Sequence, residues 1–364
     1  MSEVRTHKRT TIKDVALAAG SSRGVVSSVL NGNRHVNTRV RPETEERIRQ
    51  TARSLGYRPN AIAQSLQRRK THSILFASYF VSSLLNTHSG SFYIEALDGA
   101  LSATTRRGYD LMIHLVQYDD PEKAAVLGDG RADGCIWIAP DVDDPVVPRL
   151  RRELDWPLVV FGGRIAGATA NIIADNFQGM ELAVEHLYEL GHRRLAFVSQ
   201  NNLSYECAER WGAFSRACVR CGLDARQIIA VLTEPDANGR RDFVGESIMT
   251  PLMDPVTRPT GIITFNDSLA SSVMQCARQI GLETPRDLSV IGFDSTPLCE
   301  SYTPPLTSVR QPLGAMIARC VEILIDENVS AAGDEAVDDL RIEMFPCHLD
   351  VRASTATVPG KTLL

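Results

Sequence analysis

The apolar residues between positions 11 and 31 recur at helical spacing, which predicts two short amphipathic helices joined by a tight turn. Thr11 followed by Asp14 has the spacing of a helix N-cap pair, and Gly20 ends the first helix. Ser22 is typical of a residue that caps the next helix. The apolar side of this second helix consists of Val25, Val26, Val29 and Leu30.

A third helix is predicted from about Thr44 to Leu55, because Ile48, Ala52 and Leu55 share one face and Gly56 follows. We expect the three helices to pack their apolar sides together. The second helix then keeps a small, polar outward face made of Arg23, Gly24, Ser27 and Ser28. Such a face can approach base edges and phosphates in the major groove of DNA, although three short helices also occur in other globular domains.

The distribution of charge favours nucleic acid as the partner of this segment. Residues 1 to 70 hold 15 Lys and Arg against 5 Asp and Glu, whereas the remaining residues hold 24 against 39. An acidic chain has therefore concentrated its positive charge at one end. Charge runs are often only solvated surface, but an excess of this size beside a groove-sized helix is the pattern expected for phosphate contact.

The segment from Asn60 to Leu66 is too short to form a stable helix alone. Isolated helices of fewer than roughly 12 to 15 residues are marginal in water. Because ordering the backbone costs on the order of 1 to 2 kcal/mol per residue, we expect this segment to fold only against a dimer partner and DNA together. A flexible linker into the next domain is the alternative interpretation.

From Thr71 onwards, apolar runs alternate with amphipathic stretches. This alternation is typical of a parallel α/β fold, and about 290 residues suffice for two lobes that close over a ligand. The predicted strands are 73–80, 110–116, 135–139, 158–161, 195–199, 228–232, 261–265 and 289–293. The predicted helices include 93–107, 179–190, 207–221 and 269–280.

An ordered series of motifs runs through the N-terminal end: Thr11 to Ala16, Ala19-Gly20, Ser22, Val26-Ser27, Val29 to Asn31, Leu55 to Asn60, Ala63 and Leu66. The series resembles the lactose-repressor (LacI/GalR) family of bacterial transcription regulators. The resemblance implies a homodimer whose second helix lies in the major groove, while paired hinge helices enter the minor groove with Leu66 as an apolar wedge. It places Arg23, Gly24 and Ser28 at base-reading positions, and Ser22, Ser27, Asn31 and His35 at phosphate-contacting positions. Thr11, Asn60 and Ala63 complete the expected DNA-binding set.

Ser21, Val25 and Ser28 depart from the family pattern, and the stretch from residue 36 to 44 is a few residues longer than usual. The change at Ser28 matters most, because the family commonly has Arg there. A bidentate contact from Arg to guanine discriminates by about 1 to 3 kcal/mol. We therefore expect a different operator, with Arg23 carrying more of the base recognition.

The remaining chain resembles the effector domain of the same family, which is like the periplasmic sugar-binding proteins. The matching motifs are Asp175-Asn176, Gly191-His192, Arg210 with Phe214, and residues 265–267, 291–294, 305–311 and 351–355. By position, the resemblance implies that Arg210, Asn266, Asp294 and Gln311 contact the ligand. These side chains supply paired donors and acceptors for a hydroxyl-rich molecule.

Each of these ligand contacts has a structural alternative: Asp294 can cap a turn, and Arg210 can belong to an ion pair. On the first-lobe side, Asp141 follows a predicted strand and is a further candidate for ligand contact. Trp137 either lines the pocket or packs in the core, as a Trp within a strand more often does.

Together, these patterns predict an all-α helix-turn-helix DNA-binding domain and an α/β two-lobed, periplasmic-binding-protein-like effector domain. The expected boundaries are a headpiece at 1–58, a hinge helix and linker at 59–71, an effector-binding and dimerisation domain at 72–355 and a tail at 356–364. The expected function is ligand-responsive, sequence-specific transcriptional regulation, most simply repression. The expected partners are double-stranded operator DNA, a second copy of the chain and a sugar-like effector. A dimer is expected rather than a tetramer, because the tail has no heptad repeat.

Other functions find less support in the sequence. No phosphate-binding loop, dinucleotide fingerprint or hydrolase motif occurs, so we expect neither an enzyme nor a cofactor. A DNA-binding sugar kinase would need such a phosphate loop, and a stand-alone sugar-binding module would leave residues 11 to 66 without a role. The CxxC motif from Cys218 to Cys221 lacks partners at zinc spacing, which favours buried free thiols over a metal site. Without an apolar signal segment, a cytoplasmic protein with no membrane contact is expected.

Overall fold

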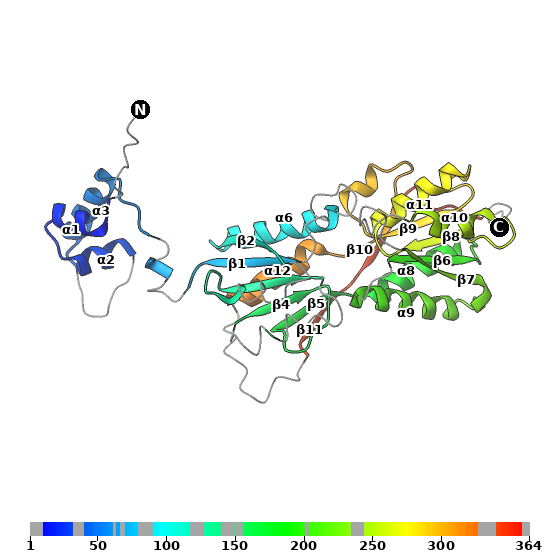
Figure 1. The fold of residues 1–364 in the computed structure, drawn as a ribbon, viewed down its shortest axis with the longest axis horizontal. Coiled ribbons are helices and arrows are strands. Elements are labelled where there is room, and N and C mark those ends of the chain that lie inside the picture. Colours follow the sequence, from blue (N-terminus) through cyan, green and yellow to red (C-terminus); the bar gives the residue numbers. More distant parts are fainter. Residues whose placement is uncertain are drawn as a thin grey trace, which may run out of the picture. The chain divides into compact units, whose positions relative to one another are not determined.

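The computed structural model describes residues 10–31, 40–60, 63–65, 70–78, 90–116, 127–139, 149, 156–200, 204–233, 244–326 and 340–358. The chain divides into two compact units, residues 1–72 and 73–364. The first unit is helical, and the second contains two mainly parallel sheets with helices packed against them (Figure 1).

The first unit contains α1 (Ile12–Ala18), α2 (Arg23–Asn31) and α3 (Pro42–Ser54). The predicted caps of the first two helices are confirmed. Thr11 and Asp14 form a reciprocal capping box, in which the Thr11 N–H donates to the Asp14 carboxylate at 2.8 Å. The Val25 N–H donates to Ser22 Oγ at 3.3 Å. Gly20 has a φ of 58°, the left-handed conformation that ends α1.

The three helices share a small apolar core. Val15, Val26, Val29, Ile48 and Ala52 are buried in it. The prediction that Leu55 belongs to this core is wrong, because α3 ends at Ser54 and Leu55, in the C-cap position, is 39% exposed. The helix also begins at Pro42, two residues before the predicted start, because the fixed φ of proline suits the first turn of a helix.

The first lobe of the second unit is a six-stranded parallel sheet in the order β11-β5-β4-β3-β1-β2. Its strands are β1 (Ser73–Ser78), β2 (Asp110–Leu115), β3 (Gly134–Ile138), β4 (Leu158–Phe161), β5 (Ala170–Ala174) and β11 (Ile342–Phe345). The helices α6 (Gly90–Arg106) and α12 (Leu313–Asp326) pack together against this sheet. Trp137 of β3 is fully buried among apolar residues, which confirms the core interpretation.

The second lobe is a six-stranded sheet in the order β12-β10-β9-β8-β6-β7, in which only β12 is antiparallel to its neighbour. Its strands are β6 (Leu195–Gln200), β7 (Ile228–Thr233), β8 (Gly261–Thr264), β9 (Ser289–Asp294), β10 (Thr307–Arg310) and β12 (His348–Asp350). Its helices are α8 (Asn176–Glu189), α9 (Tyr205–Arg220), α10 (Gly245–Met253) and α11 (Asp267–Gln279). Residues of α8 and α9 pack on one face of the sheet, and residues of α10 and α11 pack on the other.

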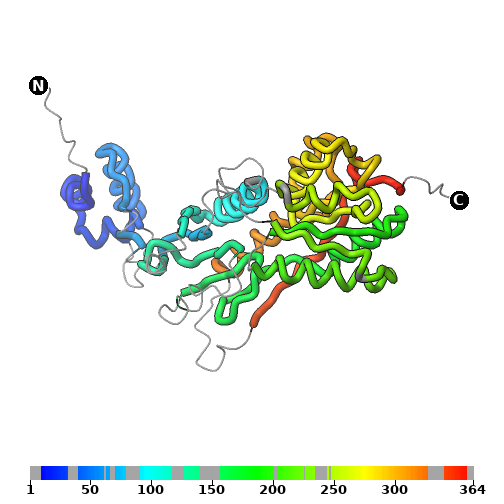
Figure 2. Tube along the Cα trace, turned by 45° about the vertical axis from the view of Figure 1, so that its right-hand side comes forward, coloured from blue at the N-terminus to red at the C-terminus, as the bar shows by residue number. Residues whose placement is uncertain are grey.

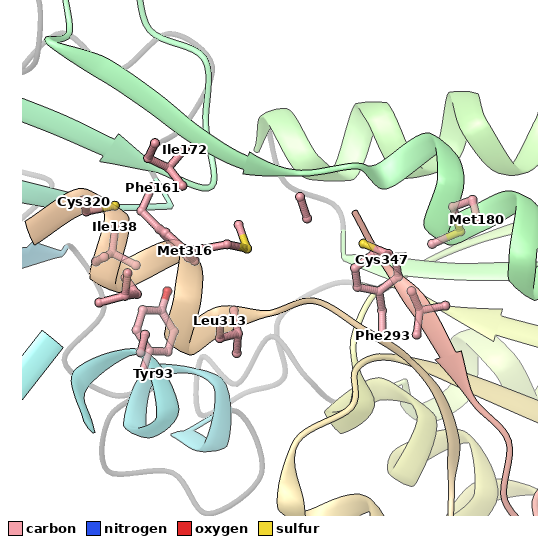
Figure 3. Packing of buried hydrophobic residues seen from close by; sticks show 14 of the residues in the cluster. Tyr93, Ile138, Phe161, Ile172, Met180, Phe293, Leu313, Met316, Cys320 and Cys347 are labelled. Carbon is pink, nitrogen blue, oxygen red and sulfur yellow. The ribbon is translucent and has the colours of Figure 1, made fainter. Parts of the chain in front are cut away.

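The chain passes between the lobes at three places: from β5 to α8, from β10 to α12 and from β11 to β12 (Figure 2). One apolar cluster follows these connections through both lobes. It includes Phe161 and Met316 in the first lobe and Met180 and Phe293 in the second (Figure 3). With this topology, the carboxyl ends of the parallel strands of both lobes lie beside the three connections between the lobes.

The four helices that the apolar pattern predicted in this unit begin two or three residues earlier in the structure. Three of these starts are capped by side chains that lie outside the apolar pattern: Asp175, Ser204 and Asn266. The strands β5, β10, β11 and β12 and the helices α10 and α12 were not predicted. Each of the four strands has only three to five residues, and all four mix polar with apolar side chains.

All eight cysteines are free thiols. Cys218 is buried and Cys221, the other half of the CxxC motif, is half-buried. Burial raises the pKa of the Cys218 thiol to about 12. A thiol with a raised pKa is a poor nucleophile and metal ligand. The predicted burial is confirmed for Cys218, whereas Cys221 is only half-buried.

His192 joins the second-lobe sheet to the segment that follows β12. Its Nε2 lies 3.0 Å from the Ala356 carbonyl oxygen, and its Nδ1 lies 3.0 Å from Thr260 Oγ1. Because a carbonyl can only accept, the neutral ring carries its proton on Nε2 and accepts at Nδ1. Burial lowers the pKa of His192 from 6.5 to about 4.

We expect the folded protein to lose stability through His192 as the pH falls from about 6.5 to 4, because the unfolded chain binds a proton there that the folded chain excludes. The loss should reach about 3 kcal/mol. Urea unfolding of wild type and His192→Gln across this range measures the difference in slope. The exposed His348→Gln variant is the control, and equal pH dependence in wild type and His192→Gln would contradict the assignment.

Candidate DNA-binding and effector sites

The outward side of α2 lines a groove of about 560 Å³ in the first unit. Arg23, Gly24, Ser27 and Asn31 form its α2 side. Thr10, Thr11 and Ile12 also line it, together with Tyr57, Arg58, Asn60, Ala63 and Gln64 from the segment after α3. Arg23 and Gly24 are exposed, and Ser27 and Ser28 are half-buried. The structure thus brings Thr11, Asn60 and Ala63 next to the predicted recognition face of α2.

One helical turn at residues 63–65 is bound to the end of α2. The Gln64 N–H donates to the Asn60 carbonyl at 3.0 Å. Gln64 Nε2 donates to Asn31 Oδ1 at 2.8 Å, and Asn31 Nδ2 donates to Ser27 Oγ at 3.0 Å. Gln64 was not among the predicted residues, because no local pattern relates two positions 33 residues apart.

Three predicted site residues, His35, Leu66 and Asp141, lie outside the described residues. Their roles in contacting phosphate, wedging the minor groove and binding the effector stay predictions.

Arg210 is the central cation of the predicted effector site. It lies on α9 and is 1% exposed. Its Nε donates to Asn176 Oδ1 at 2.9 Å and its Nη1 donates to the Phe265 carbonyl. The guanidinium also lies 3.7 Å from the centroid of the Phe293 ring. These contacts fix the guanidinium plane at the carboxyl ends of β8 and β9.

Asp294 and Gln311 meet beside Arg210. Gln311 Nε2 donates to Asp294 Oδ1, and both side chains are buried. Asp294 ends β9 with a φ of 109°, a conformation that non-glycine residues rarely adopt. Burial raises the pKa of the Asp294 carboxyl well above its usual range, although Arg210 opposes the shift. Strained and buried polar groups of this kind concentrate at functional sites.

Asn266 has a structural role in addition to the predicted ligand contact. Its Oδ1 accepts the Leu269 N–H at 2.9 Å and thereby caps α11. The neighbouring Asp267, which was not predicted, is buried and accepts from Ser308 Oγ and from the Thr296 N–H. Burial raises the pKa of Asp267 to about 6. The cap motif Asn266-Asp267 at a strand end could have drawn attention to this residue.

Glu206 was also missed, and among the described residues it is the one carboxylate that forms an ion pair with Arg210. Its Oε1 lies 3.6 Å from Arg210 Nη2, near enough for an ion pair but beyond hydrogen-bond distance. Gly162 of the first lobe faces the same carboxylate, since a Cβ on this glycine would lie 3.2 Å from Glu206 Oε1. Burial raises the pKa of Glu206, and Arg210 opposes the shift.

Polar contacts join the two lobes around these residues. Arg164, in the connection after β4, pairs with Glu209 of α9 at 3.0 Å and stacks on Tyr205 at 4.8 Å. Ser91 at the start of α6 donates to Thr296 Oγ1 at 2.9 Å. Such side-chain contacts can exchange for ligand contacts when two lobes move about a hinge.

Within the described ranges, no helix combines the length and apolar character needed to cross a bilayer. In that same part of the chain, no group of His, Cys, Asp and Glu side chains is arranged to hold a metal ion.

Family models match both units. The model for bacterial regulatory proteins of the lacI family matches residues 11–60, and the model for a periplasmic binding protein-like domain matches residues 184–355. The HTH-type transcriptional repressor PurR of Vibrio cholerae is 31% identical over 322 residues, which cover 87% of this chain and 90% of that protein. The ribose operon repressor of Escherichia coli is 29% identical and covers 86% and 92%, respectively.

Solved structures agree with this assignment. The lac repressor dimer bound to operator and the anti-inducer ONPF has a TM-score of 0.77 at 23% identity and covers 96% of this chain and 100% of its own. The complex of the regulator CelR with cellobiose has a TM-score of 0.65 at 25% identity and covers 95% and 100%. The fold, the two family models and the long alignment with PurR repressors agree, and the chain belongs to the lacI family of bacterial regulatory proteins.

Proposed function

We propose that this lacI-family regulator represses transcription by binding an operator through α2, and that a small polar effector held beside Arg210 controls the binding. The observation that carries the DNA-binding part is the face of α2. A packed three-helix core presents exposed Arg23 and Gly24 above a groove, on the unit in which Lys and Arg outnumber Asp and Glu by 15 to 5. A helix with these properties fits the major groove.

In this proposal, Arg23, Gly24 and Ser28 read bases, while Ser22, Ser27, Asn31 and His35 contact phosphates. Thr11, Asn60 and Ala63 support the contact, and Leu66 enters the minor groove. The exposure of Arg23 and the position of Asn60 and Ala63 on the same groove support these roles. The functional division is a headpiece at 1–58, a hinge at 59–71, an effector and dimerisation domain at 72–355 and a tail at 356–364.

Arg210, Asn266, Asp294 and Gln311, with Asp141 from the first lobe, bind the effector in this proposal. Relatives support a carbohydrate: one is named the ribose operon repressor, and the CelR structure is a complex with cellobiose. The curated relatives are transcriptional repressors, which supports a regulatory rather than an enzymatic role. Because the target is bacterial DNA, we place the protein in the cytoplasm.

In this proposal the protein is a homodimer, and effector binding shifts the two lobes of each subunit. This shift couples the effector site to the DNA-binding site. Such couplings amount to about 1 to 3 kcal/mol, and they are reciprocal. Operator DNA must therefore change effector affinity by the same factor by which the effector changes operator affinity.

The proposal is tested by selecting genomic fragments with the full chain and measuring their affinity by fluorescence anisotropy. Arg23→Ala should reduce the preference for the selected site over random DNA roughly 10- to 100-fold, because it removes a base contact worth about 1 to 3 kcal/mol. The exposed Arg53→Ala variant removes the same charge from α3 and should preserve the preference. Failure of the wild type to prefer any fragment, or equal effects of both variants, would contradict the proposal.

A further inference from the structure

Two polar atoms at the centre of the candidate effector site have no hydrogen-bond partner among the described residues. They are Arg210 Nη2, a donor, and Gln311 Oε1, an acceptor. Both side chains are at least 98% buried, at 1% and 2% exposure. Buried polar groups in native proteins are nearly always paired, so an unpaired donor and acceptor on two side chains that both interact with Asp294 indicate a place for a ligand.

The groups around these atoms mostly accept hydrogen bonds. Glu206 is 6% exposed, and within the described part of the chain its carboxylate makes no hydrogen bond, only the 3.6 Å approach to Arg210. Asp294 receives the single amide of Gln311. A ligand here would therefore find three groups that can still accept hydrogen bonds: the two carboxylates and the Gln311 amide oxygen. It would find only one unpaired donor, the guanidinium nitrogen of Arg210.

In the described part of the chain, three further arginines near the site are bound to carboxylates of their own. Arg164 pairs with Glu209 at 3.0 Å. Arg310 and Arg352 both lie against Asp350, at 2.5 and 3.5 Å. Among the described residues, Arg210 is the one cation that interacts with both Glu206 and Asp294, so two carboxylates already share it.

On the basis of the proposed function, we infer that the effector is an uncharged molecule rich in hydroxyl or amide donors, and that Glu206 determines this specificity. Glu206 accepts a hydrogen bond from the ligand and repels phosphorylated or carboxylate analogues. Gly162 supports the arrangement, because any larger residue there would press on the Glu206 carboxylate. A further anion in these buried surroundings would meet like charges at short range, and the described residues offer it no cation that is not already paired with a carboxylate.

Inorganic phosphate is the simplest probe of this charge selection. Thermal unfolding of the full chain is followed with phosphate or with chloride of equal ionic strength. We expect phosphate to leave the transition of the wild type unchanged and to raise that of Glu206→Gln by about 2 °C or more, because the variant removes the carboxylate that approaches Arg210 Nη2 at 3.6 Å. Glu185→Gln, which makes the same charge change at an exposed position of α8, should behave like the wild type.

An equal phosphate response in the wild type and Glu206→Gln would overturn the inference, as would the absence of any response in Glu206→Gln. Glu206→Met provides a second variant with similar side-chain length and no charge. A complementary arm compares ribose with ribose 5-phosphate and glucose with glucose 6-phosphate. A larger stabilisation of the wild type by a phosphorylated member than by its uncharged partner would also overturn the inference.

DNA binding is measured on the same preparations by anisotropy with selected fragments. Loss of fragment preference in the wild type would contradict the proposed function. A wild type that prefers its fragment but is stabilised by phosphate as strongly as Glu206→Gln would contradict only the charge selection at Glu206. The two outcomes are therefore distinguishable.

Discussion

Raising the salt concentration from 50 to 200 mM should weaken operator binding roughly a thousandfold, if about six cationic contacts release counterions from the DNA. The physical reason is the charge segregation, with 15 Lys and Arg against 5 Asp and Glu in the first 70 residues. Anisotropy titrations at four or more salt concentrations give the slope of log affinity against log salt. Each phosphate contact contributes about 0.9 to this slope on duplex DNA.

Two variants separate phosphate contacts from stability effects in the salt experiment. Lys13→Ala and Arg58→Ala each remove a cation from the headpiece, and a residue that contacts phosphate should reduce the slope by about one. Glu185→Gln lies in the second unit and should leave the slope unchanged. A wild-type slope near −2 would contradict broad phosphate contact, and it would limit DNA contact to a few residues such as Arg23.

The headpiece could be predicted well because its signals are local. The Thr11 and Asp14 pair, Ser22 and Gly20 act within one turn of the chain, and the structure confirms each of them. Leu55 was placed wrongly, because the apolar pattern alone does not show where the helix ends. The bond from Gln64 to Asn31 could not be predicted, because it depends on how the segment after α3 folds back along α2.

The effector site depends on contacts between distant residues, so the sequence revealed less of it. The family motifs identified Arg210, Asp294 and Gln311, which the structure brings together from α9, from the end of β9 and from the residue after β10. Glu206 carries no motif of its own. Its significance follows from its position one helical turn before Arg210 and from the approach of Gly162 in the other lobe.

The hinge shows how a local argument can be incomplete. Helix propensity predicts that residues 60 to 66 are disordered without a dimer partner and DNA. In the structure, the turn at residues 63–65 is already bound to α2 through Gln64. A contact of this kind offsets part of the entropy cost of ordering the segment. The dimer partner and the DNA then have to supply less stabilisation.

Replacing Arg210 by Met should destabilise the second unit by about 3 to 5 kcal/mol, because it leaves Glu206 and Asp294 buried without their cation. Urea unfolding followed by tryptophan fluorescence measures this loss. All three tryptophans, at positions 137, 156 and 211, lie in the second unit, so the signal reports on that unit alone. The Arg210→Met and Glu206→Met double variant should recover part of the loss, because it removes one of the two stranded carboxylates.

Arg220→Met is the matched control for Arg210→Met, since Arg220 lies on the same helix in exposed ion pairs with Glu181 and Glu185. Exposed pairs of this kind are worth at most about 1 kcal/mol. A loss of less than 1 kcal/mol in Arg210→Met would mean that both carboxylates are already neutral in the folded protein. Arg210 would then have no negative charge beside it, and its unpaired Nη2 would favour an anionic effector. That outcome would contradict the inferred selection of an uncharged effector, which requires Glu206 and Asp294 to be ionised.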